Sequence, residues 1–141
     1  MKHTDKFYLL KHVTVMTSSI TSTYFSYTKG ADNFLLYPDG RAPYKMHEES
    51  TKSVPWDIQS HMRRIGMDRT EYILLKSIII CDPTAENLTP SGRAIVREER
   101  EKFAQALVSY LMAKYGPAKA PTIYVDCIAI LDRMYSKVGL L

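Results

Sequence analysis

The chain has 141 residues, of which 45% are hydrophobic and 24% are charged, and it carries a formal net charge of +4. This length accommodates one domain with a sizeable buried core, and the composition is ordinary for a soluble globular protein. Apolar runs fall well short of the roughly 20 residues that a membrane-spanning helix needs, so we expect no membrane contact. The basic residues are spread along the chain rather than gathered in a block, so we expect no direct contact with DNA.

The first predicted element spans residues 4–28, where apolar residues recur at the three- and four-residue steps of one helix face. Its many threonines and serines are poor helix formers, because β-branching and hydroxyl groups favour other backbone conformations. A strand over residues 13–20 is therefore an alternative on propensity alone. If the segment is a helix, packing must override that propensity, so we expect it to be deeply buried.

Two shorter elements follow in the chain. Residues 34–37 are apolar, and residues 38–41, Pro-Asp-Gly-Arg, form a turn in which proline presets φ and glycine tolerates positive φ. Together they predict a small β-hairpin over residues 34–45. Residues 56–66 have apolar side chains near helical spacing and end at Gly66, a natural helix stop, so we predict a helix there.

The most apolar stretch lies in the middle of the chain, where only Lys76 and Ser77 interrupt the apolar residues between positions 73 and 81. A helix that is apolar on nearly all sides belongs inside a domain. The isoleucines of this stretch would also suit a buried strand, which periodicity alone cannot decide. Length and flanking residues favour a helix that either Asp68 or Thr70 caps and that a proline ends.

The last part of the chain predicts two further helices. The dipeptide Thr89-Pro90 starts the first, because the missing N–H of proline costs nothing at the first helical position. Alternating charges give this helix a solvated face as far as about residue 115, where Gly116-Pro117 ends it. A final helix covers residues 123–137. The chain is thus predicted to be mainly helical, as an interaction or adaptor module would be.

Residues that carry catalytic or cofactor chemistry form no motif in this sequence. There is no Gly-rich phosphate loop, no histidine pair at metal-ligand spacing and no Gly-x-Ser-x-Gly elbow. Cys127 with a distant histidine could be a nucleophilic pair, but a cysteine inside an apolar helix stripe is usually inert. Two cysteines are also too few for a disulfide scaffold or a four-cysteine zinc site. We therefore expect no enzyme, no metal, no cofactor and a reducing compartment.

Four stretches, in this order, resemble the ligand-binding domain of nuclear receptors, in particular the expanded nematode branch of that family. Residues 5–11, Asp-Lys-Phe-Tyr-Leu-Leu-Lys, resemble the family signature Asp-Gln-x-x-Leu-Leu-Lys of the fourth and fifth helices. Residues 34–40, ending Pro-Asp-Gly, are similar to the β-turn that follows, and residues 71–83 resemble the eighth helix. Tyr-Gly-Pro at 115–117 and Asp-Cys-Ile-Ala-Ile at 126–130 are similar to the nematode pattern that enters the tenth helix.

The resemblance implies an all-α fold, as a partial three-layer antiparallel helical sandwich with residues 71–83 in the middle layer. We expect a single domain over residues 1–141, from about the fourth helix to about the tenth or eleventh. It would lack the DNA-binding domain, the first three helices and the activation helix. The implied function is regulation of transcription in the nucleus through a small lipophilic ligand, coregulator proteins and homo- or heterodimer contacts.

The resemblance also assigns site residues by family position. Two departures bear on these sites: Lys6 stands where the family has Gln, and Phe25 stands where relatives that bind acidic ligands often have Arg, which disfavours an acidic ligand. The alternative for the serine hydroxyls is that they bond back to their own helix. The ligand-facing residues are Val15, Ser18, Ser19, Ser22, Phe25, Phe34 and Leu36; the coactivator groove comprises Lys6, Phe7, Leu10 and Lys11; and the dimer surface comprises Ile123, Asp126, Cys127, Ile130 and Met134.

Overall fold

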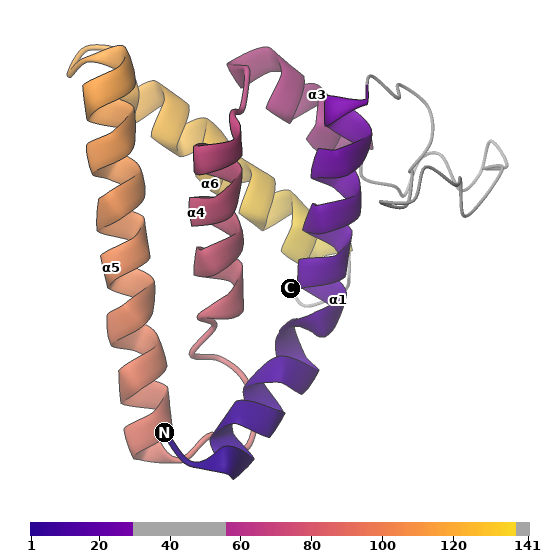
Figure 1. Ribbon diagram of the computed structural model, residues 1–141, viewed down its shortest axis with the longest axis vertical. Helices are drawn as coiled ribbons and strands as arrows, with labels where there is room; N and C mark the ends of the chain where they lie inside the picture. Colours follow the sequence, from indigo (N-terminus) through magenta and orange to yellow (C-terminus); the bar gives the residue numbers. More distant parts are fainter. Residues whose placement is uncertain (30–55, 138–141) are drawn as a thin grey trace, which may run out of the picture.

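The computed structural model describes residues 1–29 and 56–137, and over these ranges it is helical without strands. This confirms the all-α prediction, whereas the hairpin predicted over residues 34–45 lies outside the described residues. Figure 1 shows α5, α4 and α1 standing side by side with α4 in the middle, while α6 crosses them obliquely. The three-layer sandwich stays a prediction. The helices are α1 (His3–Thr28), α3 (Trp56–Ile65), α4 (Arg69–Ile80), α5 (Pro90–Tyr115) and α6 (Ala120–Lys137).

The central helix α4 forms where the most apolar stretch predicted it, and the strand alternative for this stretch is wrong. Of the two proposed caps, Asp68 is the one observed, because its Oδ1 accepts a hydrogen bond from the Glu71 N–H at 2.8 Å. The helix packs between α1 and α5, where Leu75 is fully buried. It is not enclosed on all sides, however, because Ile73 is 48% exposed on the side that neither neighbour covers.

Helix α1 is a continuous helix of 26 residues despite its poor propensity, so the strand alternative over residues 13–20 is also wrong. Part of the reason is local, because threonine hydroxyls such as those of Thr14 and Thr21 donate back to the carbonyl four residues earlier. The rest is packing along one side only, so the predicted deep burial holds for one face of the helix. That face comprises Asp5, Leu9, Val13, Met16, Ile20, Thr23 and Ser26.

Helices α5 and α6 follow the boundary signals in the sequence closely. Thr89 caps α5 by accepting from the Gly92 N–H at 3.1 Å, and α5 ends at Gly116, whose φ of 83° is in the left-handed region. Helix α6 begins at Ala120, three residues earlier than the prediction from residue 123. The difference lies at a helix end, where sequence signals are weakest.

The buried apolar side chains form two separate clusters. The smaller, which we call the second cluster, joins the first half of α1 to the α4–α5 connection and the start of α5 through Leu9, Val13, Ala85, Leu88 and Val96. The larger, which we call the main core, gathers seventeen described residues from all five helices. Its members are Met16, Ile20, Ile58, Met62, Ile65, Met67, Leu75, Ile78, Ile79, Leu107, Leu111, Ala120, Ile123, Cys127, Ile130, Leu131 and Met134.

Candidate functional site

The residues predicted to face a ligand lie on the side of α1 that turns away from the buried face. Val15 is 59% exposed and Ser18 is exposed, whereas Ser19, Ser22 and Phe25 are half-buried. Positions three and four apart share one face of a helix, so these side chains form one strip along α1, which we call the outer strip. Phe34 and Leu36, the other two predicted ligand-facing residues, lie outside the described residues.

The serine hydroxyls of the outer strip are not used by the helix itself. Back-bonding to a carbonyl of the preceding turn occurs at the neighbouring Thr14, Thr21, Thr23 and Ser26. Within the described residues, the hydroxyls of Ser18, Ser19 and Ser22 donate no such bond. The strip therefore combines apolar side chains with hydroxyl groups that can bond to another molecule.

The residues predicted for a coactivator groove lie together on the exposed side of the first half of α1. Phe7 and Leu10 are each 61% exposed, and Lys6 and Lys11 flank them. The Phe7 ring meets the Tyr8 ring edge-on, with 5.4 Å between their centroids. An apolar centre with charged residues at its rim suits an amphipathic helix. We call these four residues the coregulator surface.

The predicted dimer surface on α6 is mostly buried inside the chain. Its four apolar members, Ile123, Cys127, Ile130 and Met134, belong to the main core, so they cannot contact a partner in this conformation. Only Asp126 is partly exposed, and it accepts a hydrogen bond from Arg64 at 3.0 Å. Family position alone does not say which side of α6 faces the chain's own core, so a dimer contact through α6 stays a prediction.

Burial also decides the chemistry of Cys127. The thiol is fully buried in the main core, and this burial raises its pKa to about 12. A thiol that stays protonated at neutral pH is a poor nucleophile. The alternative of a hydrolase that uses Cys127 therefore finds no support.

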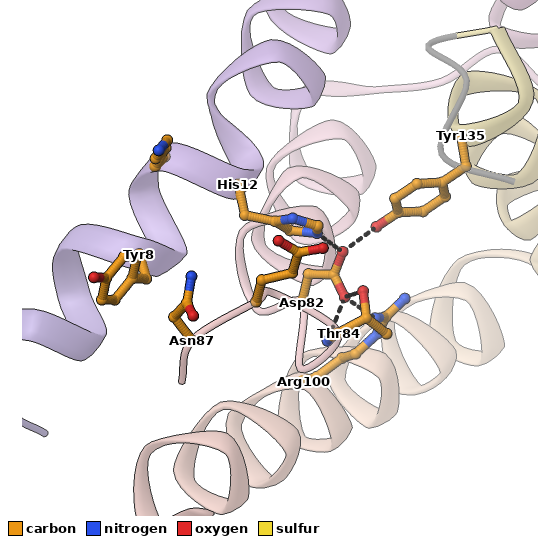
Figure 2. Close-up of a pocket in the computed structure, with 9 residues that line it drawn as sticks. Tyr8, His12, Asp82, Thr84, Asn87, Arg100 and Tyr135 are labelled. Carbon is orange, nitrogen blue, oxygen red and sulfur yellow. Dashed lines mark hydrogen bonds and ion pairs between the residues drawn. The ribbon is translucent and has the colours of Figure 1, made fainter. Parts of the chain in front are cut away.

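A polar cleft of about 680 Å³ centres on Asp82, which the sequence assigned only to a loop. Figure 2 shows His12 of α1, Arg100 of α5 and Tyr135 of α6 converging on this carboxylate. His12 Nε2 lies 2.9 Å from Asp82 Oδ2, and the Thr84 hydroxyl donates to Oδ1 at 2.7 Å. The Tyr135 hydroxyl lies 3.5 Å away and the Arg100 guanidinium 3.7 Å away. One buried carboxylate thus ties together α1, the α4–α5 connection, α5 and α6.

The electrostatics of Asp82 follow from these bonds. Burial alone would raise the pKa of its carboxyl, but the hydrogen bonds from Thr84 and His12 outweigh burial and hold the pKa below its ordinary value. The local part of this arrangement has a sequence signal, because an Asp that accepts from the residue two positions later makes an Asx turn. His12 is 70 residues away, and no local pattern could have found it.

A second buried carboxylate, Glu71, joins α4 to α5 on the other side of the domain. Lys114 donates to Glu71 Oε1 at 2.7 Å and to Asp68 Oδ2 at 2.9 Å. Glu71 is fully buried and its Oε2 has no hydrogen-bond partner, so burial raises the pKa of this carboxyl. Burial alone would lower the pKa of Lys114, but its bonds to Glu71 and Asp68 outweigh burial and raise it. Lys114 therefore stays charged and holds the two helices together.

The described residues contain neither a cluster that could hold a metal ion nor a helix that could span a membrane. Within residues 1–29 and 56–137, no three His, Cys, Asp or Glu side chains gather in a way that could hold a metal ion. None of the helices over those same ranges is long and apolar enough to cross a bilayer.

Taken together, the described helices form an all-α fold in which α1 has one buried face and one partly exposed face. Comparison with known proteins identifies the family. Residues 1–121 match the family described as the ligand-binding domain of nuclear hormone receptor. The Caenorhabditis elegans proteins nuclear hormone receptor family member nhr-136 and member nhr-209 are each 30% identical, over 92% of this chain. Member nhr-153 of the same organism is 29% identical over 91% of it.

The chain belongs to the nuclear hormone receptor family and carries sequence of its ligand-binding domain. It spans about a third of the length of these relatives, 31% of nhr-136, 33% of nhr-209 and 32% of nhr-153. This confirms the family that the sequence resemblance indicated.

Proposed function

We propose that this chain regulates transcription in the nucleus as part of a nuclear receptor ligand-binding domain. In this role α1 contacts a small lipophilic ligand through the outer strip and a coregulator through the coregulator surface. The observation that carries the proposal is the division of α1 into two faces. One face is buried in both apolar clusters, while the other leaves Phe7, Leu10 and Val15 each about 60% exposed. Large apolar side chains grouped on one side of a helix mark a contact surface.

The outer strip favours a ligand that is mainly apolar and neutral. Val15 and Phe25 offer apolar contact, and the unused hydroxyls of Ser18 and Ser22 offer a hydrogen bond that orients a polar group. Phe25 supplies no positive charge at the position where a relative with an acidic ligand would have Arg. We therefore expect an alcohol or ketone to be preferred over a carboxylic acid of the same carbon skeleton.

Native mass spectrometry of the purified chain after incubation with a mixed lipid extract tests the ligand part of the proposal. We expect a retained lipid on the wild-type chain and on Ser109→Trp, a control at an exposed position of α5. The Ser22→Trp variant fills the outer strip and should retain none. Recovery of only empty wild-type protein would count against a ligand on α1.

A labelled Leu-x-x-Leu-Leu peptide tests the coregulator part. The four residues of this surface come from one helix, so a peptide would gain contacts from a single element. We therefore expect weak binding. Chemical-shift changes on titration should centre on Phe7 and Leu10, and Phe7→Ala should abolish them. Shifts centred on another face of the domain would contradict this assignment, and tight binding in fluorescence polarisation would contradict the expected weakness.

A second candidate function is an adaptor module that binds a partner protein without any ligand. The observation that favours it is that Val15 and Ser18 lie on an exposed surface. Under this alternative, lipid retention fails while peptide binding persists. Dimer contacts remain part of the first proposal, but on α6 they would use its outer side, where Val125 is 64% exposed.

A further inference from the structure

The first half of α1 is attached to the rest of the domain differently from its second half. Figure 1 shows this half of the helix leaning towards the start of α5, away from the line of the other half. Its apolar contacts are those of the second cluster, in which Leu9 and Val13 meet Ala85, Leu88 and Val96. Five small or medium side chains form a modest core, so other interactions must hold this half in place.

Polar bonds between α1 and the α4–α5 connection supply that attachment. The fully buried Asp5 accepts from the Thr89 N–H and from the Thr89 hydroxyl, both at 2.7 Å, and these bonds hold the pKa of Asp5 below its ordinary value. One helical turn beyond Leu9, His12 and Asp82 make the second bond at 2.9 Å. Arg93 of α5 donates to the Pro83 carbonyl oxygen in the connection.

We propose that the first half of α1, residues 82–89 and the start of α5 open and close as one unit, while the main core stays folded. Local opening is expected where few buried apolar contacts hold a segment and a larger core persists next to it. The two clusters share no buried residue, so opening the second cluster removes none of the apolar contacts of the main core.

The opening unit carries the coregulator surface, because Lys6, Phe7, Leu10 and Lys11 all lie in the first half of α1. For this consequence alone the inference rests on the proposed function. A coregulator that binds only the closed form would pull the unit closed, in proportion to its affinity and concentration. Coregulator contact and the packing of the α4–α5 connection are then energetically coupled, although no peptide touches that connection.

Hydrogen exchange followed by NMR on the full chain tests the inference. After correction for intrinsic rates, the amides of residues 9–14 and the hydrogen-bonded amides of Thr89, Gly92 and Arg93 should share one protection factor, at least about tenfold below that of residues 104–111 and 123–134. Asp5→Asn should lower the protection factors of the first set by about another tenfold, because it weakens a charged hydrogen bond. The protection factors of the second set should stay unchanged. Asp126→Asn, whose partner is Arg64 on α3, is the control and should leave residues 9–14 unchanged.

One protection factor over all helices would overturn the inference, and so would an equal drop in both sets for Asp5→Asn. If that variant does not fold, the wild-type profile decides alone. Addition of the Leu-x-x-Leu-Leu peptide should raise the protection of the Thr89, Gly92 and Arg93 amides. If the peptide does not bind at all, the coregulator proposal is refuted. The opening unit is then tested separately by the exchange profile of the chain without peptide.

Discussion

The main core and the second cluster stabilise the domain by different means. The main core draws apolar side chains from all five described helices, so each helix is held by several others. The second cluster has five apolar members and depends on Asp5, His12 and Asp82, whose bonds cross from one element to another. We therefore expect substitutions that remove side-chain volume to destabilise the main core most. Substitutions that remove a charge or a hydrogen bond should mainly destabilise the second cluster.

The largest effect should follow from removing volume in the main core. Leu107 of α5 is fully buried, and Leu107→Ala should lower the free energy of unfolding by about 3 kcal/mol, because the cavity left behind only partly collapses. Urea unfolding followed by circular dichroism measures this. The neighbouring Val108 is 40% exposed, and Val108→Ala should stay within about 0.5 kcal/mol of wild type. Equal losses for the two variants would contradict the assignment of the main core.

Removing the cation at the α4–α5 junction should have the next largest effect. Lys114→Met leaves the buried Glu71 carboxylate without its partner, which costs about 2 kcal/mol, less than a fully enclosed pair because Lys114 is partly exposed. The raised pKa of Glu71 lets the folded state take up a proton before the unfolded state does, so the deficit should shrink as pH falls. Lys102→Met, on the same helix but with surface partners only, should change stability far less than Lys114→Met. A deficit that grows towards acid pH would contradict this account.

Adding a methyl group at Gly92 probes the second cluster directly. An ideal Cβ there would overlap Asp5 Oδ2, and Asp5 cannot move away without loosening its bonds to Thr89. Gly92→Ala should therefore lower stability by about 1–2 kcal/mol, even though alanine is the better helix former. Thermal unfolding measures this, with Ser109→Ala, at an exposed position of the same helix, as the control. A stabilised Gly92→Ala variant would show that Asp5 is free to move.

The smallest effect should be the acid dependence that Asp82 contributes. Its folded-state pKa lies below the ordinary 3.8, so its stabilising contribution is present above that value and is lost as pH falls through the folded-state pKa. Asp82→Asn should cost about 1 kcal/mol at neutral pH and flatten the loss of stability below about pH 4. Asp132→Asn, at an exposed position of α6, should leave the profile unchanged. An unaltered acid profile in Asp82→Asn would contradict the role of this carboxylate.

The sequence predicted the elements and the family better than it predicted the sites. Helix boundaries at Asp68, Thr89 and Gly116 are local chemistry, in which a cap or a positive φ depends on adjacent residues, so they could be predicted. The apolar stripe of α6 was visible, but spacing does not say whether a stripe meets its own chain or another. The family resemblance placed the outer strip and the coregulator surface, which remain predictions.

The polar junctions could not be predicted because each joins residues that are distant in the sequence. His12 meets Asp82 across 70 positions, and Asp5 meets Thr89 across 84. A single sequence contains the residue types of such a bond but no signal that pairs them. The helix start at Thr89-Pro90 was predicted, for instance, while the bonds of Thr89 to Asp5 depend on how α1 lies against the start of α5.

The central claim is that the two faces of α1 have separate tasks, one structural and one for contact with a ligand. The lipid-bound fraction of Val15→Asp, measured by native mass spectrometry beside wild type, tests it most directly. Val15 lies 59% exposed on the outer strip, so a charge there costs little stability but opposes an apolar ligand. The account predicts a folded protein with an unchanged melting temperature and no retained lipid. Undiminished lipid retention by the folded variant would contradict it.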